Sequence, residues 1–115
     1  MMVRELRTLM EFRSLLEQGT WLILFVEDRE SRRSKYAIAL LHDLTPYMSR
    51  MNVLTGIVYG NVSPRIVEEE NVDYYPYFKL YMNGAVVWEQ IGCLMNYEND
   101  VKVLKRSIRE IMAKL

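Results

Sequence analysis

The sequence predicts an α/β fold in which a central mixed sheet is flanked by helices, with the element order β-α-β-α-β-α-β-β-α. Two observations carry this prediction. Apolar runs of strand length alternate with segments whose apolar residues recur at helical spacing, as in parallel sheets with right-handed crossovers. Farther along, Asn83-Gly84 separates two apolar runs and predicts an antiparallel hairpin at one edge of the sheet.

The first elements are expected to be a short edge strand over residues 3–6 and a helix that follows Thr8. The Thr8 hydroxyl can accept a hydrogen bond from a free backbone N–H, and Glu11 three residues later completes a capping box. Gly19 suits a left-handed helix exit. The apolar face of this helix consists of Met10, Phe12, Leu15 and Leu16.

The middle of the chain predicts two buried strands joined by a long helix. The continuous apolar run 21–26 is typical of a strand covered on both faces, and the charged stretch 27–33 predicts a loop at its carboxyl end. Helical spacing of apolar residues predicts a helix over 35–50, which Pro46 is expected to kink or to tighten in its last turns. The second buried strand is expected over 53–59.

The remaining elements are a short helix, the hairpin and a final helix. Ser63 is expected to cap the short helix, with Pro64 at its first position. The hairpin strands are expected over 77–82 and 85–91. A last helix is predicted to follow the cap residue Asn96, and its buried stripe consists of Val101, Leu104, Ile108, Ile111, Met112 and Leu115.

Composition narrows the class of protein. At 115 residues the chain is expected to form a single domain over 1–115. Fifteen basic and fifteen acidic residues give no global attraction to nucleic acid or anionic lipid. The single cysteine, Cys93, excludes an intrachain disulfide and favours a reducing compartment. With no bilayer-length apolar run and no signal peptide pattern, we expect a cytoplasmic protein without membrane partners.

The order and lengths of these elements resemble the thioredoxin fold over nearly the whole chain. The segment TWLILFVED resembles the central strand before the redox motif of that family. Tyr75-Pro76 lies where thioredoxins carry a cis-proline, and YMNGAVV resembles their Lys-Asn-Gly hairpin. Ile91-Gly92-Cys93 resembles the Val-Gly-Ala that ends their last strand. The resemblance implies a thioredoxin-like sheet with a peptide-binding groove beside the proline.

The chain departs from that family at the redox site. The family's Cys-x-x-Cys-Lys falls on Ser31-Arg32-Arg33-Ser34-Lys35, and its buried aspartate corresponds to Phe25. Thiol–disulfide exchange requires a thiolate, which serine does not provide, and Cys93 has no partner cysteine. The only histidine, His42, lies about two turns along the same predicted helix, so no Ser-His pair is expected. No metal-ligand spacing and no cofactor fingerprint is present, so the sequence favours a protein that is not an enzyme but does not decide the question.

The four residues at the positions of the family's Cys-x-x-Cys motif have two possible roles each. Ser31 and Ser34 are vestigial redox positions that either still serve binding or simply cap the helix. Arg32 and Arg33 stand at a helix amino terminus, where they either hold an anionic partner or are solvated and neutralised by nearby acids.

Tyrosines surround the proline. Tyr74, Tyr75 and Tyr77 either form an aromatic groove with Pro76 or pack beneath the sheet edge. In thioredoxin-like proteins the backbone just before this proline pairs with an extended peptide, so the resemblance implies a peptide site here.

Three functions remain open at this point. The first is a redox-inactive thioredoxin-like module that holds a peptide or protein partner between the Ser31–Ser34 turn and the Tyr75–Pro76 loop. Its partner-binding residues are predicted to be Arg32, Arg33, Tyr74, Tyr75, Pro76 and Gly92. The second is a thiol–disulfide oxidoreductase whose cysteines were replaced by serine. The third is a homodimer that uses the groove or the 85–91 edge strand, where Trp88 is either exposed or packed under a helix.

Overall fold

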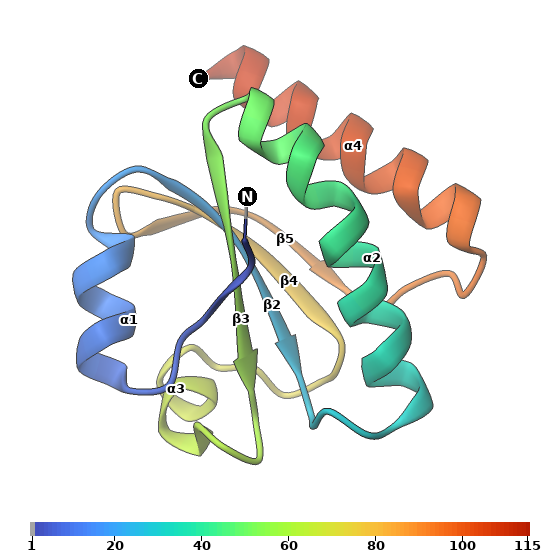
Figure 1. The fold of residues 1–115 in the computed structure, drawn as a ribbon. Helices are drawn as coiled ribbons and strands as arrows, with labels where there is room; N and C mark the ends of the chain where they lie inside the picture. The colour runs from blue at the N-terminus through green and yellow to red at the C-terminus, as the bar shows by residue number, and fades with distance from the viewer. Residues whose placement is uncertain (1) are drawn as a thin grey trace.

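The computed structural model describes residues 2–115, which form a five-stranded mixed sheet with helices on both faces (Figure 1). This architecture confirms the predicted fold class. The strands are β1 (Arg4–Glu5), β2 (Thr20–Val26), β3 (Val53–Tyr59), β4 (Tyr77–Met82) and β5 (Ala85–Ile91). The helices are α1 (Leu9–Leu16), α2 (Arg32–Arg50), α3 (Pro64–Glu69) and α4 (Tyr97–Lys114).

The strand order is β1-β3-β2-β4-β5, so the two outermost strands are the first and last in the sequence. β1, β3 and β2 run parallel, whereas β4 and β5 run antiparallel to their neighbours. Asn83 and Gly84 both have positive φ angles, 48° and 88°, which is the backbone twist that a two-residue hairpin requires. The predicted hairpin is confirmed.

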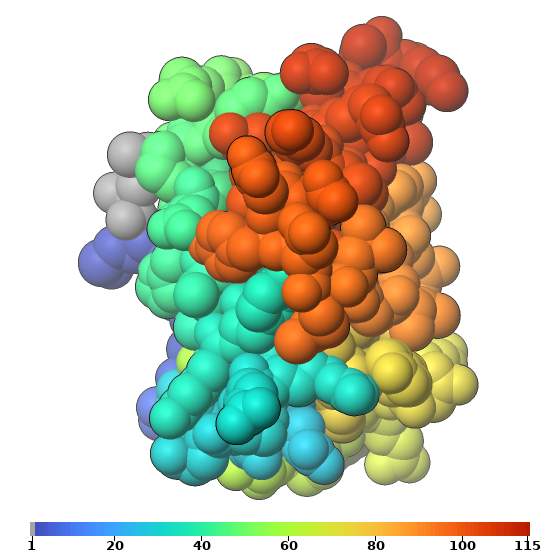
Figure 2. All heavy atoms as spheres, turned by 90° about the vertical axis from the view of Figure 1, so that its right-hand side faces the viewer, coloured from blue at the N-terminus to red at the C-terminus, as the bar shows by residue number. Residues whose placement is uncertain are grey.

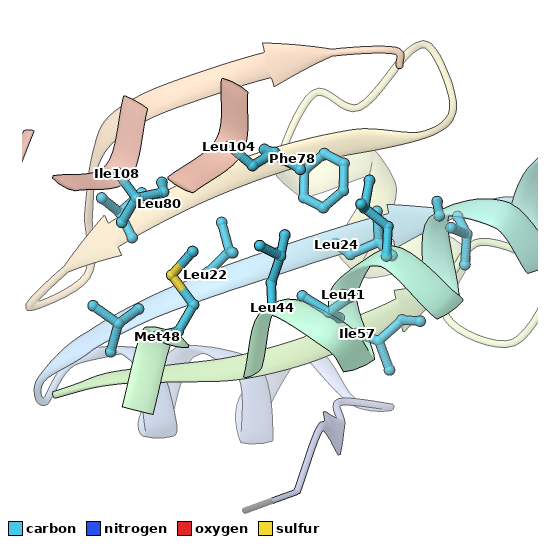
Figure 3. Packing of buried hydrophobic residues seen from close by; sticks show 14 of the residues in the cluster. Leu22, Leu24, Leu41, Leu44, Met48, Ile57, Phe78, Leu80, Leu104 and Ile108 are labelled. Atoms are coloured by element: carbon cyan, nitrogen blue, oxygen red, sulfur yellow. The ribbon is translucent and has the colours of Figure 1, made fainter. Parts of the chain in front are cut away.

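Two apolar clusters lie on opposite faces of the sheet. α2 and α4 cover one face, and the side chains of Leu41, Leu44 and Met48 pack there against strand residues (Figure 3). Leu104 and Ile108 of α4 lie beside Phe78 and Leu80 of β4 in the same cluster. α1 and α3 cover the other face, where the cluster is built around Phe12, Phe25, Ile66, Tyr77 and Tyr81.

Helix capping follows the predicted residues at three helix starts, with one shifted boundary. Thr8 accepts from the N–H of Glu11 at 3.1 Å, and Asn96 accepts from the N–H of Asn99 at 3.1 Å. α2 begins at Arg32, three residues before the predicted start, because Ser31 already caps it. The shift places both arginines in the first turn of the helix instead of in a loop.

Other local predictions, for the partners of Glu11 and Ser63 and for the burial of two apolar side chains, were wrong. The Glu11 carboxylate accepts from the N–H of Arg7 at 3.0 Å instead of from Thr8. Ser63 donates to the carbonyl of Arg7 at 2.8 Å and makes no capping bond to α3. Met10 and Leu115, both predicted to be buried, are exposed.

α2 continues through Pro46 to Arg50. One turn of the helix is supported from the side, since the Thr45 hydroxyl donates to the carbonyl of Leu41 at 2.8 Å. The same hydroxyl lies 3.2 Å from that of Thr55 on β3, which ties the helix to the sheet. Within residues 2–115, none of the helices has the length and apolar character that a bilayer crossing requires.

Candidate functional site

The turn between β2 and α2 is ordered by Asp28. Its carboxylate accepts from the backbone N–H of Ser31 at 2.8 Å and of Glu30 at 3.1 Å. These hydrogen bonds, led by that of Ser31, favour the ionised form and hold the pKa of Asp28 below its usual value. Asp28 therefore fixes the approach of the chain to the start of α2.

The two serines complete this turn. The Ser34 N–H donates to Ser31 Oγ at 3.2 Å, and Ser31 Oγ donates to Ser34 Oγ at 2.8 Å. Ser34 is buried, and its Oγ also accepts from the N–H of Asp28 at 3.5 Å. Both hydroxyls are thus engaged within the turn, and Ser31 has the helix-capping role that the sequence left open.

The 31–34 turn contains neither a histidine nor a cysteine. A serine nucleophile needs a base within hydrogen-bond reach. His42, the only histidine, is exposed and lies eight positions beyond Ser34 on α2, which places it roughly 12 Å away along the helix axis. Thiol exchange at this turn is excluded because no sulfur is present in it.

A pocket of about 330 Å³ lies between the serine turn and the segment before β4. Figure 2 shows the cyan start of α2 next to the yellow segment that leads into β4, with the orange start of α4 above them. The Tyr75–Pro76 peptide bond is cis. The walls of the pocket are formed by Val26, Glu27, Ser31, Arg33, Ser34, Asp73, Tyr74, Tyr75 and Pro76.

One of the two arginines faces this pocket. The guanidinium carbon of Arg33 lies 5.9 Å from the ring centroid of Tyr74, and its Nη1 donates to the tyrosine hydroxyl at 3.3 Å. Arg32 is exposed and lies outside the pocket walls. Among residues 2–115, no ion pair joins either arginine to an acid, so neighbouring carboxylates do not neutralise them by direct contact.

The three tyrosines near Pro76 have different environments. Tyr74 is 47% exposed and forms the outer wall of the pocket. Tyr75 is half-buried and packs against Gly60, where a Cβ atom would lie only 2.2 Å from the tyrosine hydroxyl. Burial, together with the charge of Glu27, raises the pKa of Tyr75. Tyr77 is buried in the sheet, so it belongs to the core.

Gly92, the remaining predicted site residue, lies outside the first pocket. It lines a second pocket of about 460 Å³ on the other side of Tyr74, with Ile91, Cys93 and Leu94 among the walls. Its φ angle is 80°, and a Cβ atom there would come within 3.8 Å of the Tyr74 ring. Tyr74 therefore separates the two pockets and is shared by both.

Cys93 is held in its thiol form. It is partly buried against the main core, and burial, followed by the charge of Asp100, raises its pKa to about 12. A thiol with this pKa is almost fully protonated at neutral pH. The lone cysteine is therefore a poor nucleophile in the folded protein.

Asp100 organises the loop between β5 and α4, and the sequence interpretation missed it. This fully buried carboxylate accepts from the N–H groups of Leu94 at 2.8 Å and Met95 at 3.1 Å, and from the hydroxyl of Tyr36 at 2.5 Å. It holds Met95 at a φ angle of 62°, a conformation that costs energy for a large side chain. The available signal was its position, because Asp100 lies on the same helical stripe as Leu104.

The fold and the altered turn define a thioredoxin fold that lacks a cysteine pair. Thioredoxin from Trypanosoma brucei brucei superposes with a TM-score of 0.82 and 16% identity over 97% of this chain and 92% of that one. Mitochondrial thioredoxin 3 from Saccharomyces cerevisiae gives 0.77 and 23% identity over 94% of each chain. Thioredoxin from Fasciola hepatica gives 0.78 and 15% identity over 94% and 98%. No protein-family model and no curated protein matches the sequence.

Proposed function

We propose that this chain is a redox-inactive thioredoxin-fold module that binds an extended peptide segment of a partner protein. The observation that carries the proposal is the pocket of about 330 Å³ between the Ser31–Ser34 turn and the Tyr74–Pro76 segment. In thioredoxin-like proteins the backbone before the proline pairs with an extended peptide. Here the neighbouring wall offers an aromatic ring and a guanidinium group instead of a thiolate.

Redox inactivity follows from the chemistry of the turn. Electron transfer to a disulfide requires a thiolate that attacks one sulfur and a second thiol that releases the mixed disulfide. Serines occupy both positions, and Cys93 combines a raised pKa with the absence of any second cysteine in the chain. The insulin-reduction assay with dithiothreitol is expected to give no turnover above the reagent alone, and clear turnover would contradict this part of the proposal.

Binding is expected to depend on Tyr74 and Arg33. An exposed tyrosine with an arginine against its ring is a typical anchor for a peptide, because both side chains offer large contact areas with directional polar groups. We expect the preferred peptides to carry one carboxylate, which pairs with Arg33, beside an apolar residue. Further acidic residues are expected to be disfavoured, because the carboxylates of Glu27 and Asp73 also line the pocket.

A displayed library of random linear peptides tests the site directly. The dissociation constant of the best binder is expected to rise at least about tenfold in Arg33→Ala and in Tyr74→Ala. Arg32→Ala is the matched control, because it removes the same charge from the same helix turn outside the pocket, and it is expected to change binding less than about threefold. If Arg33→Ala and Arg32→Ala raised the dissociation constant equally, the pocket would not be the peptide-binding site.

The second candidate is an oxidoreductase whose two cysteines were replaced by serine. The observation that favours it is the position of the two hydroxyl groups, 2.8 Å apart at the start of α2 in a thioredoxin fold. The natural coding sequence decides between the candidates, because serine codons at 31 and 34 end the second one.

A further inference from the structure

The pocket between the Ser31–Ser34 turn and the Tyr74–Pro76 segment has charges of both signs on its walls. Its lining includes the guanidinium group of Arg33 and the carboxylates of Glu27 and Asp73. All three side chains belong to exposed residues. Within the described residues 2–115, none of the three takes part in an ion pair. Their charges are therefore free to interact with a bound ligand.

The carboxylate of Glu27 lies on the side of the pocket toward β3. The N–H of Asn61, two residues beyond β3, donates to the Glu27 carbonyl at 3.0 Å. The Tyr75 hydroxyl lies against Gly60, the first residue after β3. Burial, followed by the charge of Glu27, raises the pKa of Tyr75, which agrees with a carboxylate close to this tyrosine.

Asp73 extends this negative wall toward α3. The hydrogen bond to Glu89 is the largest cause of the raised pKa of Tyr77, and the charge of Asp73 adds to it. Tyr77 belongs to the apolar cluster that α1 and α3 cover. The Asp73 carboxylate therefore acts on the α3 side of the sheet, away from α2 and α4.

Arg33 forms a positive wall on the side toward β5. Its Nη1 donates to the Tyr74 hydroxyl at 3.3 Å, and Tyr74 also lines the second pocket with Gly92 and Cys93. Burial and the charge of Asp100 raise the pKa of Cys93, whereas the charge of Arg33 lowers it, which agrees with a guanidinium near this thiol. In the sheet, β2 separates β3 from β4 and β5, so the positive and negative walls lie on opposite sides of the pocket.

We infer that the preferred ligand is an extended segment with one acidic and one basic residue two positions apart. The inference rests on the proposed peptide-binding function and names the class of peptide. The acidic residue pairs with Arg33, and the basic residue binds the carboxylates of Glu27 and Asp73. A volume of about 330 Å³ corresponds to a width of roughly 7 Å, which is about the distance between residues i and i+2 on one face of a strand.

A segment with charges of a single sign fits these walls less well. An acidic segment gains the contact with Arg33 but is repelled by the two carboxylates, and a basic segment meets the reverse arrangement. A segment with both charges gains an attraction at each wall. Its order of charges is also recognised, because a peptide that pairs with the backbone before Pro76 runs in one direction.

Blocked heptapeptides that differ only in their three central residues test this ligand class on the full chain. The two bipolar peptides carry Lys-Leu-Asp and Asp-Leu-Lys, and each has an acid-only counterpart in which glutamine replaces lysine. Dissociation constants are measured by NMR titration. One bipolar peptide is expected to bind at least about fivefold more tightly than its acid-only counterpart and than the peptide of reversed order.

A double variant, Glu27→Gln with Asp73→Asn, tests the negative wall. It is expected to weaken binding of the preferred bipolar peptide about fivefold and to strengthen binding of the acid-only peptide, because attraction and repulsion are both removed. Damage to the fold would weaken both peptides, so the opposite signs are specific to charge selection. Glu30→Gln is the matched control, because Glu30 is an exposed acid of the same turn outside the pocket walls, and it is expected to change neither constant more than about twofold.

The outcomes distinguish this inference from the function on which it rests. If acid-only peptides bind through Arg33 and lysine gives no gain in either order, the bipolar ligand is wrong while the peptide site stands. A preference that persists in the double variant overturns the inference as well. If none of these peptides binds at roughly 1 mM, the inference is wrong, and the random library decides the proposed function separately.

Discussion

The two edges of the sheet are protected in different ways. β1 is only two residues long, and both of them are charged: Arg4 lies 3.5 Å from Glu11, and Glu5 accepts from Arg7 at 2.8 Å and Arg29 at 2.7 Å. β5 is seven residues long and carries one charge, which its own sheet compensates. Surface ion pairs thus protect the β1 edge. At the β5 edge, Tyr77 and Lys79 of the neighbouring strand bind the only charged side chain, and the outward backbone groups have no neighbouring strand. Four experiments test this contrast.

The largest effect is expected from Asp100→Ala, which removes the buried anchor at the end of β5. The N–H groups of Leu94 and Met95 and the hydroxyl of Tyr36 lose their shared acceptor. The free energy of unfolding is expected to fall by about 3 kcal/mol in urea titrations, because unpaired buried polar groups are costly. Asp43→Ala, which removes an exposed acceptor of Tyr97, is the control and is expected to cost less than about 1 kcal/mol. Equal losses would show that the β5–α4 loop does not depend on its buried carboxylate.

The alkylation rate of the Cys93 thiol provides a second test of the structure at the carboxyl end of β5. Since its pKa is raised to about 12, its thiolate fraction at pH 8 is small, and each pKa unit lowers that fraction about tenfold. The alkylation rate of the folded protein is expected to be at least about a hundredfold below that of the same chain in urea. Asp100→Ala is expected to bring the two rates closer together. A fast rate in the native wild-type chain would contradict a closed environment around the thiol.

The hydrogen bond between Tyr77 and the Glu89 carboxylate can be tested by measuring the stability of the protein at alkaline pH. The hydrogen bond to Glu89, followed by burial, raises the pKa of Tyr77 to about 12, above the ordinary value of about 10. The raised pKa means that the folded state holds this proton more tightly than the unfolded state does. The resulting stabilisation is fully present below pH 10 and is lost as the pH rises through 12.

The contribution of Tyr77 is on the order of 1 to 2 kcal/mol. Thermal unfolding of wild type and Tyr77→Phe at several pH values between 9 and 12 isolates it from the other tyrosines. The wild-type chain is expected to lose more stability than the variant over this range. If the stability of wild type and of Tyr77→Phe changed with pH in the same way, the hydrogen bond between Tyr77 and Glu89 would not stabilise the fold.

The smallest effect is expected at β1. Glu5→Ala removes two exposed ion pairs, to Arg7 and Arg29, and exposed pairs contribute little in water. The free energy of unfolding is expected to fall by less than about 1 kcal/mol, and added salt is expected to reduce the difference further. A loss as large as that of Asp100→Ala would remove the contrast between the edges.

The sequence was sufficient for most of the fold because its signals are local. Buried strands appeared as continuous apolar runs, the hairpin turn as Asn83-Gly84, and two helix starts as Thr8 and Asn96. Errors arose where a polar side chain had a choice of partners. Ser63 was expected to cap α3 and instead bonds to Arg7, which lies far away in the sequence. Local propensity does not contain such a contact.

The candidate site was predictable only in part. The resemblance to thioredoxins indicated the serine turn and the Tyr75–Pro76 segment, which the fold brings to one pocket. Periodicity along one helix did not show that Arg33 turns toward Tyr74 while Arg32 stays outside. Periodicity also did not show that Gly92 lines a separate pocket. The orientation of Arg33 and the position of Gly92 both depend on how α2, β4 and the β5–α4 loop pack together.

The lack of a cysteine pair was already contained in the order of residues, because the serines at 31 and 34 provide no thiolate in any fold. The environment of each remaining group depended on packing. Burial raised the pKa of Cys93. Packing of α4 against the sheet buried Asp100, whose carboxylate accepts hydrogen bonds from the β5–α4 loop. The strand order placed β5, and not β4, at the edge of the sheet. These properties come from contacts between segments far apart in the chain, and their energies depend on how completely water is removed from each group.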